Sequence, residues 1–478
     1  MQVTTLIHDI SVAGVRGDLA STDVSSVEFD SREVRRGSLF CCVPGSHTDG
    51  HDHAAEAVGG GATSLLCERF LDLDVTQVRV APGTIRPAMA EVASAFFDHP
   101  SRALTMVGIT GTNGKTTVAQ LVRSILNASG QSTGVIGTLD GVRTTPEAPV
   151  LQRLLAELRS SGHGAVAMEV SSHALSQHRV DGIVFDVAAF TNLSRDHLDH
   201  HRTMDEYFAA KARLFDPATA RMAVINVDDP WGRRLADGLS GDRVVPVQRS
   251  DATDVTLSIG SSSFVWRGRS VTVPLSGMFN VDNALVAASV ATSLGVDGAH
   301  VVAGLSSAPA VPGRMEVVSA GPPFAVMVDY AHTPAGLDVA LSAARALAGP
   351  ARVICLFGCG GDRDEGKRPE MGAVAARRSD VIVLTSDNPR SEDPMAIIEQ
   401  ILPGIGDTID PVVEPHRAEA IRTAIMLARP GDVVVLAGKG HETTQVTAGR
   451  VEPFDDRVEA RRALAERFQG PTPGRSDR

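Results

Sequence analysis

The stretch from Leu104 to Leu126 restricts the possible fold more than any other feature of the chain. A mostly apolar run, Leu104 to Val107, leads into Gly108-Ile-Thr-Gly-Thr-Asn-Gly-Lys-Thr-Thr117, and a helical pattern follows from Val118 to Leu126. A strand, a glycine-rich turn and a helix in this order form a phosphate cradle, because backbone N–H groups and the helix N-terminus face the anion. The sequence therefore predicts a nucleotide site, and the alternative is an incidental glycine turn.

Within this turn, Lys115 would reach the β- and γ-phosphates of a nucleotide, and Thr116 would offer its hydroxyl to Mg²⁺. The spacing departs from the common phosphate-loop pattern, since Ile109 stands five residues before Gly114 where that pattern has glycine. The glycines of the turn are Gly108, Gly111 and Gly114. The prediction depends on the flanking strand and helix as much as on the Gly-Lys-Thr triplet.

The length and charge of the chain limit the classes of protein to consider. With 478 residues and about 150 residues per domain, we expect about three domains. The hydrophobic content of 43% is enough for several cores. The net charge of −12 argues against a nucleic-acid groove, so an anionic substrate must be met by local basic groups.

The cysteines and the apolar runs indicate a cytoplasmic protein. The five cysteines are scattered, and Cys355 and Cys359 have no second pair with which to form a zinc site. Few, odd-numbered cysteines suggest a reducing compartment. Met1 to Val12 lacks the charged and apolar regions of a signal peptide, and no apolar run approaches the roughly 18 residues of a membrane span.

The alternation of apolar runs and helical patterns predicts three α/β domains, with residues 1–100, 101–318 and 319–478. In the middle domain, strands are expected at 165–168, 187–190 and 223–226, and antiparallel strands within 255–273. In the last domain, strands are expected at 325–329, 353–357, 381–385 and 433–437. Such alternation favours mostly parallel sheets with helices on both faces, and ligands then bind at the carboxyl ends of the strands.

Two polar segments follow strands of the middle domain. Glu169, in Glu169-Val-Ser-Ser-His173, is a candidate Mg²⁺ ligand, and the alternative is a helix-capping Ser-Ser pair beside a surface glutamate. The second segment, Thr191 to His201, crowds Asp196, His197, Asp199, His200 and His201 into six positions. With ATP implied, one histidine aiding Mg²⁺ or orienting water fits better than a transition-metal site, and the alternative is a loop of solvated histidines.

Four polar loops end strands of the last domain. Asp329, in Asp329-Tyr-Ala-His-Thr-Pro334, could accept a hydrogen bond from a ribose hydroxyl. The other loops are Gly360 to Arg368, Ser386 to Arg390, and Gly438 to Glu442, and each brings Arg or Lys beside a carboxylate. Together they would form a pocket for a zwitterion with an extra carboxylate, since arginine binds carboxylates bidentately. Each loop alone could instead be a solvated turn.

The ordered motifs resemble the Mur ligases over nearly the whole chain. They are the phosphate loop, Glu169 to His173, Thr191 to Asp199, Gly313-Arg-Met-Glu316, Asp329 to Pro334, and Gly438 to Glu442. The similarity is greatest to the MurE type, which adds the third residue of the peptidoglycan stem peptide. Asp30-Ser-Arg32 and Gly45 to His51 are similar to that family's uridine-nucleotide domain, which implies such a domain at the N-terminus, a phosphate-loop ATPase domain in the middle and a Rossmann-like domain at the C-terminus.

The resemblance also implies roles for individual residues. Lys211 lies in a helix expected over 204–215, where the residues alone predict an ordinary solvated lysine; the family implies a carbamylated lysine that holds a second Mg²⁺. The implied ATP contacts are Gly111, Thr112, Asn113, Gly114, Lys115, Thr116, Thr117, Asn283, Arg314 and Asp329. The implied metal ligands are Thr116, Glu169, His197 and carbamylated Lys211, and the implied catalytic residues are Lys115, Lys211 and His197.

The implied substrates are UDP-N-acetylmuramoyl-L-alanyl-D-glutamate, meso-diaminopimelate and ATP. The muramoyl peptide would contact Ser31, Thr144, Thr145, Ser171, Gln177 and Arg179. The amino acid would contact Arg363, Asp387, Asn388, Pro389, Arg390, Gly438 and Glu442. Many members have a longer loop than Leu139 to Arg143, so substrate contacts at that rim are expected to differ.

The sequence therefore predicts a cytoplasmic ATP- and Mg²⁺-dependent amide ligase that acts as a monomer, without nucleic acid or membrane as partner. Lysine has no distal carboxylate, so a lysine-adding enzyme would not need Arg390. The alternatives are a lysine-adding or secondary-metabolic Mur-like ligase, and a nucleotide-dependent switch without ligase chemistry.

Overall fold

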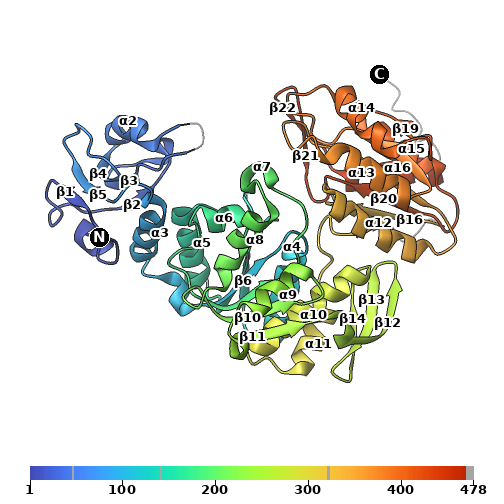
Figure 1. The fold of residues 1–478 in the computed structure, drawn as a ribbon, viewed down its shortest axis with the longest axis horizontal. Coiled ribbons are helices and arrows are strands. Elements are labelled where there is room, and N and C mark those ends of the chain that lie inside the picture. The colour runs from blue at the N-terminus through green and yellow to red at the C-terminus, as the bar shows by residue number, and fades with distance from the viewer. Residues whose placement is uncertain (46–47, 140, 142, 320–322, 470–478) are drawn as a thin grey trace, which may run out of the picture.

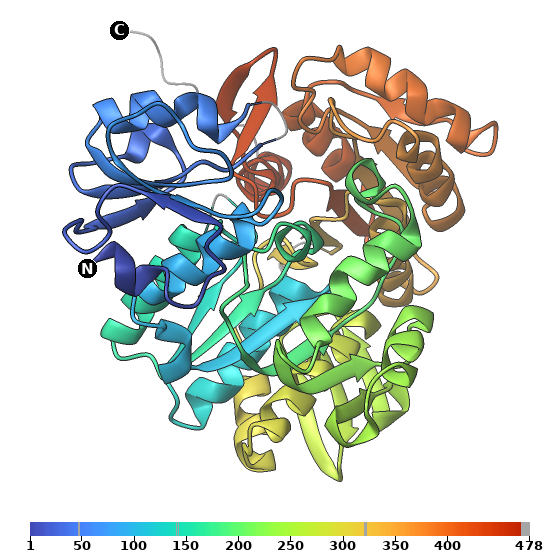
Figure 2. The same ribbon diagram turned by 60° about the vertical axis from the view of Figure 1, so that its left-hand side comes forward.

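The computed structural model describes residues 1–45, 48–139, 141, 143–319 and 323–469, and within these residues the chain forms three α/β units (Figure 1). The N-terminal and C-terminal units lie on either side of the central unit, and Figure 2 shows both of them above it. The ranges predicted for the three domains remain predictions, and Ala320 to Pro322, close to the second predicted boundary, lies outside the described residues. Among the described residues, no helix is both long and apolar enough to cross a membrane.

The N-terminal unit is built on a five-stranded sheet in the order β1-β5-β4-β3-β2, in which only β1 is antiparallel to its neighbour. Its strands are β1 (Gly14–Arg16), β2 (Ser26–Glu28), β3 (Ser38–Cys41), β4 (Ala62–Cys67) and β5 (Thr76–Arg79). Its helices are α1 (Val3–Leu6), α2 (Ala54–Gly59) and α3 (Ile85–Phe96), with the short 3₁₀ helices η1 (Ser31–Glu33) and η2 (Gly50–His53). A third 3₁₀ helix, η3 (Pro100–Ala103), leads to the central unit.

The central unit contains a parallel six-stranded sheet in the order β11-β10-β9-β6-β8-β7. Its strands are β6 (Thr105–Thr110), β7 (Thr133–Ile136), β8 (Ala165–Glu169), β9 (Phe185–Phe190), β10 (Ala220–Asn226) and β11 (Val244–Val247). Its helices are α4 (Lys115–Ala128), α5 (Ala148–Ser160), α6 (Ser172–Ser176), α7 (Leu198–His201), α8 (Met204–Ala212), α9 (Pro230–Asp237), α10 (Met278–Ser293) and α11 (Gly298–Ser306). Short 3₁₀ helices are η4 (Arg213–Phe215), η5 (Gly241–Arg243) and η6 (Arg249–Asp251).

Both faces of the central sheet are buried, as its apolar strands predict. Along β6, Val107 and Ile109 belong to the core beneath α4, α10 and α11, while Met106 belongs to the core on the other face. The segment 255–273, predicted to be antiparallel, falls within a separate three-stranded antiparallel sheet, so this prediction is confirmed. Its strands are β12 (Ala252–Ser258), β13 (Ser261–Trp266) and β14 (Arg269–Val273).

The C-terminal unit has a six-stranded sheet in the order β15-β16-β20-β17-β18-β19, parallel except for β15. Its strands are β15 (Glu316–Ser319), β16 (Ala325–Asp329), β17 (Val353–Phe357), β18 (Val381–Leu384), β19 (Val412–Val413) and β20 (Val433–Ala437). A hairpin of β21 (Thr444–Thr447) and β22 (Arg450–Pro453) follows β20. The helices are α12 (Pro334–Ala348), α13 (Lys367–Arg378), α14 (Pro394–Ile405), α15 (Arg417–Leu427) and α16 (Asp456–Gln469).

The parallel strands place the polar loops at one edge of each large sheet. In the central sheet, β6 lies between β8 and β9, so the loops that follow these three strands are neighbours. In the C-terminal sheet, β16, β20, β17 and β18 are consecutive, so the four polar loops of this unit are neighbours too. The three predicted strands at 325–329, 353–357 and 433–437 match β16, β17 and β20 residue for residue.

Candidate active site

The glycine-rich turn connects β6 to α4 with two glycines in conformations that other residues rarely adopt. The φ angle is +147° at Gly111 and +87° at Gly114. A Cβ atom at Gly111 would collide with Thr191, and one at Gly114 would collide with the amide of Asn283. The backbone can therefore pass close to these side chains, and α4 begins at Lys115 with its N-terminus at the loop.

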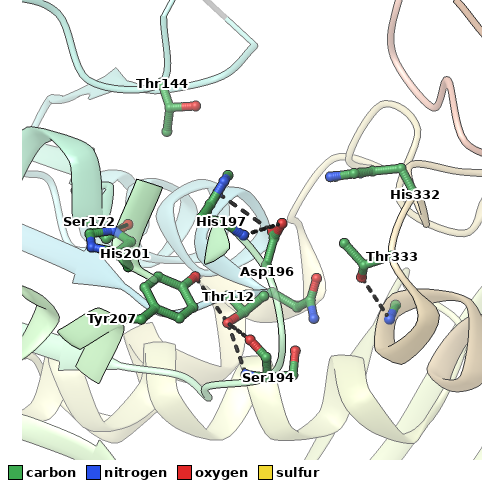
Figure 3. Close-up of polar contacts among 12 residues, drawn as sticks. Thr112, Thr144, Ser172, Ser194, Asp196, His197, His201, Tyr207, His332 and Thr333 are labelled. Atoms are coloured by element: carbon green, nitrogen blue, oxygen red, sulfur yellow. Dashed lines mark hydrogen bonds and ion pairs between the residues drawn. The ribbon is translucent and has the colours of Figure 1, made fainter. Parts of the chain in front are cut away.

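Hydrogen bonds from neighbouring segments hold this phosphate loop in place. Ser194 N donates to Thr112 Oγ1 over 3.0 Å, and the Tyr207 hydroxyl lies 3.2 Å from the same oxygen (Figure 3). Asn113 N donates to Asn192 Oδ1 over 3.0 Å. Thr117 is buried in the first turn of α4. The segment after β9 therefore supports the loop from behind.

Thr116 and Glu169 form the oxygen-rich part of the site. Thr116 Oγ1 donates to Glu169 Oε2 over 3.0 Å, and Thr138 N donates to Glu169 Oε1 over 2.8 Å. Glu169 is the last residue of β8 and is only 1% exposed, so the alternative of a surface glutamate is wrong. The capping alternative is correct for Ser171, whose hydroxyl accepts from Ala174 N at the start of α6.

These oxygens fit Mg²⁺ bound together with a nucleotide. Mg²⁺ prefers oxygen ligands and is usually held by one or two carboxylates together with substrate phosphates and water. Glu169 and Thr116 supply such a partial set beside the phosphate loop. In the described part of the chain, no group of three or more His, Cys, Asp or Glu side chains could hold a metal ion alone.

The histidine-rich segment is partly buried and partly exposed. His197 is 43% exposed at its side chain and has its Nε2 3.5 Å from Asp196 Oδ2 (Figure 3). Desolvation lowers the pKa of His197, whereas Asp196 raises it. His201 is buried, stacks on Tyr207 and has its Nε2 2.8 Å from Ser172 Oγ. The alternative of a loop of solvated histidines is therefore wrong for His201.

Lys211 is buried, not solvated. The residue is 1% exposed, its Nζ donates to Gly111 O over 2.9 Å, and it lies 4.7 Å from the centre of the Tyr207 ring. Burial, assisted by Lys115, lowers the pKa of Lys211 well below its usual value of 10.5. The sequence of α8 gave no sign of this burial, because a lone lysine among alanines on a helix is ordinarily solvated; only the family motif distinguished it.

The other residues expected to contact ATP lie around the phosphate loop. Asn283, on α10, faces Gly114, and Arg314 Nη2 donates to Thr116 Oγ1 over 3.2 Å. Asp329 Oδ2 accepts from Met315 N over 2.8 Å, and burial raises the pKa of Asp329 to about 6. A cavity of about 490 Å³ between α10 and α12 opens beside Asn113 and Gly114. This cavity provides space for a nucleotide base next to the loop.

Five of the six residues expected to contact the muramoyl peptide lie together beyond Glu169. Ser171 N donates to Thr145 Oγ1 over 3.0 Å, and Thr144 Oγ1 lies 3.0 Å from Thr138 Oγ1. Arg179 donates to Thr145 O over 2.8 Å and to Gln177 Oε1 over 2.7 Å. Ser31 lies apart, in η1 of the N-terminal unit, where its hydroxyl donates to Glu56. Residues 140 and 142 of the short loop lie outside the described residues.

Glu147 is a buried carboxylate that sequence reasoning missed. It lies 2.7 Å from Arg143, 2.8 Å from Arg179 and 3.3 Å from Arg86, which comes from α3 of the N-terminal unit. Its side chain is 8% exposed. The only feature of the sequence that could have pointed to Glu147 was its position two residues after Thr145, a predicted substrate contact. Glu147 links the muramoyl-peptide residues to the N-terminal unit.

Six of the seven residues expected to contact the amino acid line one cavity of about 340 Å³ at the edge of the C-terminal sheet, and Pro389 is the exception. From the loops after β17, β18 and β20 the cavity receives Arg363, Asp387, Asn388, Arg390, Gly438 and Glu442. Asp387 and Asn388 are 6% and 8% exposed, so solvated turns do not describe them. The backbone carbonyl of Pro389 lies so close to Gly361 that a Cβ there would collide with it.

The same cavity is also lined by the central unit, through His173, Arg195, Asp196 and His197. Arg195 forms an ion pair of 2.5 Å with Glu370 on α13. Figure 3 shows His332, from the loop after β16, on the opposite side of Asp196 from Tyr207. The cavity therefore joins the predicted amino-acid residues to the histidine segment behind the phosphate loop.

Comparisons with known proteins agree with this geometry. Family models match residues 23–109 (Mur ligase family, catalytic domain), 109–291 (Mur ligase middle domain) and 313–440 (Mur ligase, glutamate ligase domain). The UDP-N-acetylmuramoyl-L-alanyl-D-glutamate–2,6-diaminopimelate ligase of Syntrophomonas wolfei is 42% identical over 97% of the chain and 99% of that protein. The protein of the same name from Solibacter usitatus is 46% identical over 94% of each.

A solved structure of a UDP-N-acetylmuramoyl-L-alanyl-D-glutamate–2,6-diaminopimelate ligase is similar along the whole chain. It is 31% identical, covers 99% of this chain and 100% of its own, and has a TM-score of 0.68. Several relatives are more than 40% identical over nearly their full length, and three Mur ligase family models match consecutive parts of the chain. These matches decide the classification. The chain belongs to the Mur ligase family.

Proposed function

We propose that the protein is an ATP-dependent amide ligase that adds meso-diaminopimelate to UDP-N-acetylmuramoyl-L-alanyl-D-glutamate in the synthesis of peptidoglycan precursors. The observation that carries this proposal is the cavity that joins Arg390, Asn388 and Glu442 to the histidine segment behind the phosphate loop. The names of relatives that are 42% and 46% identical support the same substrates.

In the first step, the terminal carboxylate of the muramoyl peptide attacks the γ-phosphorus of ATP and ADP leaves, which forms an acyl phosphate. Lys115 and the N-terminus of α4 would bind the phosphates, and Arg314, Asn283 and Asp329 would bind the rest of the nucleotide. Thr144, Thr145, Ser171, Gln177 and Arg179 would orient the peptide, and Ser31 its uridine nucleotide.

In the second step, the amine of meso-diaminopimelate attacks the acyl carbon, and the tetrahedral intermediate expels phosphate and loses a proton. Arg363 and Arg390 would bind the distal carboxylate of meso-diaminopimelate. Asp387, Asn388 and Glu442 would bind its distal ammonium group, and Gly438 would let the amino acid approach the backbone closely. Closure of the three units would keep water from the acyl phosphate.

Thr116 and Glu169 would hold one Mg²⁺, and His197 and carbamylated Lys211 a second, and bound Mg²⁺ would neutralise charge on the transferred phosphate. Carbamylation joins the unprotonated Lys211 amine to CO₂ with release of one proton. The buried amine and its lowered pKa support this modification, because only the neutral amine is a nucleophile. We further propose a cytoplasmic, monomeric enzyme.

The test is an amino-acid panel in an ATP-dependent phosphate-release assay with the muramoyl dipeptide. We expect phosphate release that requires both the dipeptide and meso-diaminopimelate, with lysine a poor substrate. Preference for lysine would favour the lysine-adding alternative. Phosphate release in the absence of both substrates would favour a nucleotide switch. No phosphate release when the dipeptide and meso-diaminopimelate are both present would overturn the proposal.

A further inference from the structure

Lys439 is a buried cation behind the amino-acid cavity, where it contacts the lining residues Asn388 and Glu442. It follows Gly438 at the end of β20 and is 0% exposed. Its Nζ donates to Thr444 O over 2.7 Å, to Glu442 Oε2 over 3.1 Å and to Asn388 Oδ1 over 3.2 Å. An ammonium group has three N–H donors, so these three oxygens satisfy it completely.

The contacts of Lys439 determine which way the amide of Asn388 faces. Asn388 Oδ1 accepts from Lys439 and also from Val446 N, over 3.0 Å. With its oxygen bound to two donors, the amide must turn its Nδ2 toward Glu442, to which it donates over 2.8 Å. The orientation of this cavity-lining amide is therefore a consequence of Lys439 and the β21 strand.

Lys439 also fixes the position of Glu442. Among the described residues, the hydrogen bonds to the Glu442 carboxylate, from Lys439 and Asn388, both use Oε2. Glu442 Oε1 is then the oxygen that can meet a ligand ammonium in the cavity. Asp387 Oδ1 lies 4.0 Å from Lys439 Nζ, so one buried cation lies between the two carboxylates and reduces their mutual repulsion.

From this network we propose that Lys439 is a positioning residue for amino-acid specificity: it holds Asn388 and Glu442 in the arrangement that binds the substrate's amino end, without touching the substrate. The inference rests on the proposed function, since it assumes that this cavity binds a diamino acid. Removal of Lys439 would leave Asn388 Oδ1 with Val446 N as its one remaining donor, and would leave Glu442 and Asp387 without a compensating cation. Binding of the amino acid should weaken, while the nucleotide and muramoyl-peptide sites should keep their affinities.

A merely structural role would predict a different result, so the test compares Lys439→Met with a matched destabilising control. The control is Arg352→Met, which removes an ion pair of 2.6 Å with the buried Asp432. Arg352 and Asp432 lie at the amino ends of β17 and β20, at the opposite edge of the same sheet. Steady-state kinetics of phosphate release, with each substrate varied in turn, are measured with both variants and combined with thermal unfolding.

For Lys439→Met we expect the KM for meso-diaminopimelate to rise roughly 10- to 100-fold, in line with the cost of leaving buried polar groups unsatisfied. The KM values for ATP and the muramoyl dipeptide should stay within about twofold of wild type. Lys439→Arg should recover part of the lost affinity. Arg352→Met should lower the Tm but leave the KM for meso-diaminopimelate unchanged.

The double variant Lys439→Met/Glu442→Gln tests whether Lys439 acts through Glu442. We expect Lys439→Met to raise the KM for meso-diaminopimelate only slightly further once Glu442 is changed, because the effects of coupled residues are not additive. Should Lys439→Met fail to fold, Lys439→Gln keeps a donor without charge and should raise the same KM. An unchanged KM in a folded Lys439 variant, with an active wild type, would overturn this inference alone; a wild type without meso-diaminopimelate-dependent phosphate release would overturn the proposed function.

Discussion

Lys115 and Lys211 donate to the same acceptor, the carbonyl oxygen of Gly111, each over 2.9 Å. Lys115 begins α4, and Lys211 lies near the end of α8, so two helices direct lysine side chains at one point of the phosphate loop. Burial lowers the pKa of both lysines, and Lys115 further lowers the pKa of Lys211. Under the proposed function the two neighbouring lysines would have different tasks: Lys115 would bind phosphate, and Lys211 would be modified.

Lys115→Ala should abolish ligation. Lys115 is the only lysine in the phosphate loop, so no neighbour in the loop replaces its charge. We expect kcat/KM to fall at least about 100-fold, or about 3 kcal/mol of lost transition-state stabilisation. The fold should survive, because Lys115 is only half-buried at the start of α4. Phosphate release and circular dichroism measure the two effects, and near-normal turnover would remove the ATP role from this loop.

Lys211→Ala should also lose activity, but in a form that a small molecule can restore. The variant would lack the proposed carbamate, and a short carboxylic acid such as acetate could enter the space and supply the missing anion. We expect activity to recover in part with added acid in the phosphate-release assay, whereas Lys115→Ala should not respond. Full activity of Lys211→Arg would contradict the carbamate, since arginine forms none.

The lowered pKa of Lys211 predicts how stability depends on pH. Above about pH 10.5, Lys211 is neutral in both the folded and the unfolded chain, and its titration has no effect on stability. As the pH falls below that value, the unfolded chain gains a proton that the folded chain lacks, so the folded state loses stability until its own lower pKa is reached. Methionine does not titrate, so Lys211→Met removes this pH-dependent loss of stability.

We therefore expect the Tm of Lys211→Met to exceed that of wild type in CO₂-free buffer, and the difference to be greater at pH 7.5 than at pH 9.5. Differential scanning calorimetry at both pH values measures it. A difference that is constant, or that shrinks toward neutral pH, would show that Lys211 is protonated in the folded protein.

Much of the fold followed from periodicity in the sequence. Strands β16, β17 and β20 consist of apolar residues, except for Asp329 at the end of β16, and they lie between polar or glycine-rich loops; their predicted and observed bounds coincide. The strand before the phosphate loop was predicted too short, because Gly108 was assigned to the turn. In the structure Gly108 continues β6, where the ring of Phe185 leaves no room for a Cβ.

The site was less predictable, because burial depends on contacts between distant segments. Lys211 looks like a surface residue until Tyr207 and the phosphate loop cover it. Glu147 looks like one more surface carboxylate until Arg86 reaches it from another unit. Lys439 stood within a predicted motif, but its role needs the position of Asn388, 51 residues away in sequence. Sequence pattern locates strand ends; it does not tell which side chains meet there.

Arg390→Ala should weaken the binding of meso-diaminopimelate alone. Arg390 has φ +55°, its backbone N–H donates to Val446 O over 2.9 Å, and its Nη1 donates to Gly361 O over 2.5 Å. The guanidinium is thus held at the cavity by its backbone and by the neighbouring loop, as Pro389 before it predicted. A bidentate pair with the distal carboxylate would contribute on the order of 2–4 kcal/mol.

That contribution corresponds to a roughly 30- to 1000-fold loss in kcat/KM for meso-diaminopimelate. The KM for meso-diaminopimelate should rise strongly in Arg390→Ala, and those for ATP and the muramoyl dipeptide should barely change. Arg422→Ala is the matched control, since Arg422 is an exposed arginine on α15 paired with Glu466 and does not line the cavity. Lysine should be a poor substrate for the wild type, because it would leave Arg390 desolvated and unpaired. An unchanged KM for meso-diaminopimelate, or a wild type that prefers lysine, would contradict the assignment of Arg390 and leave the ligase chemistry intact.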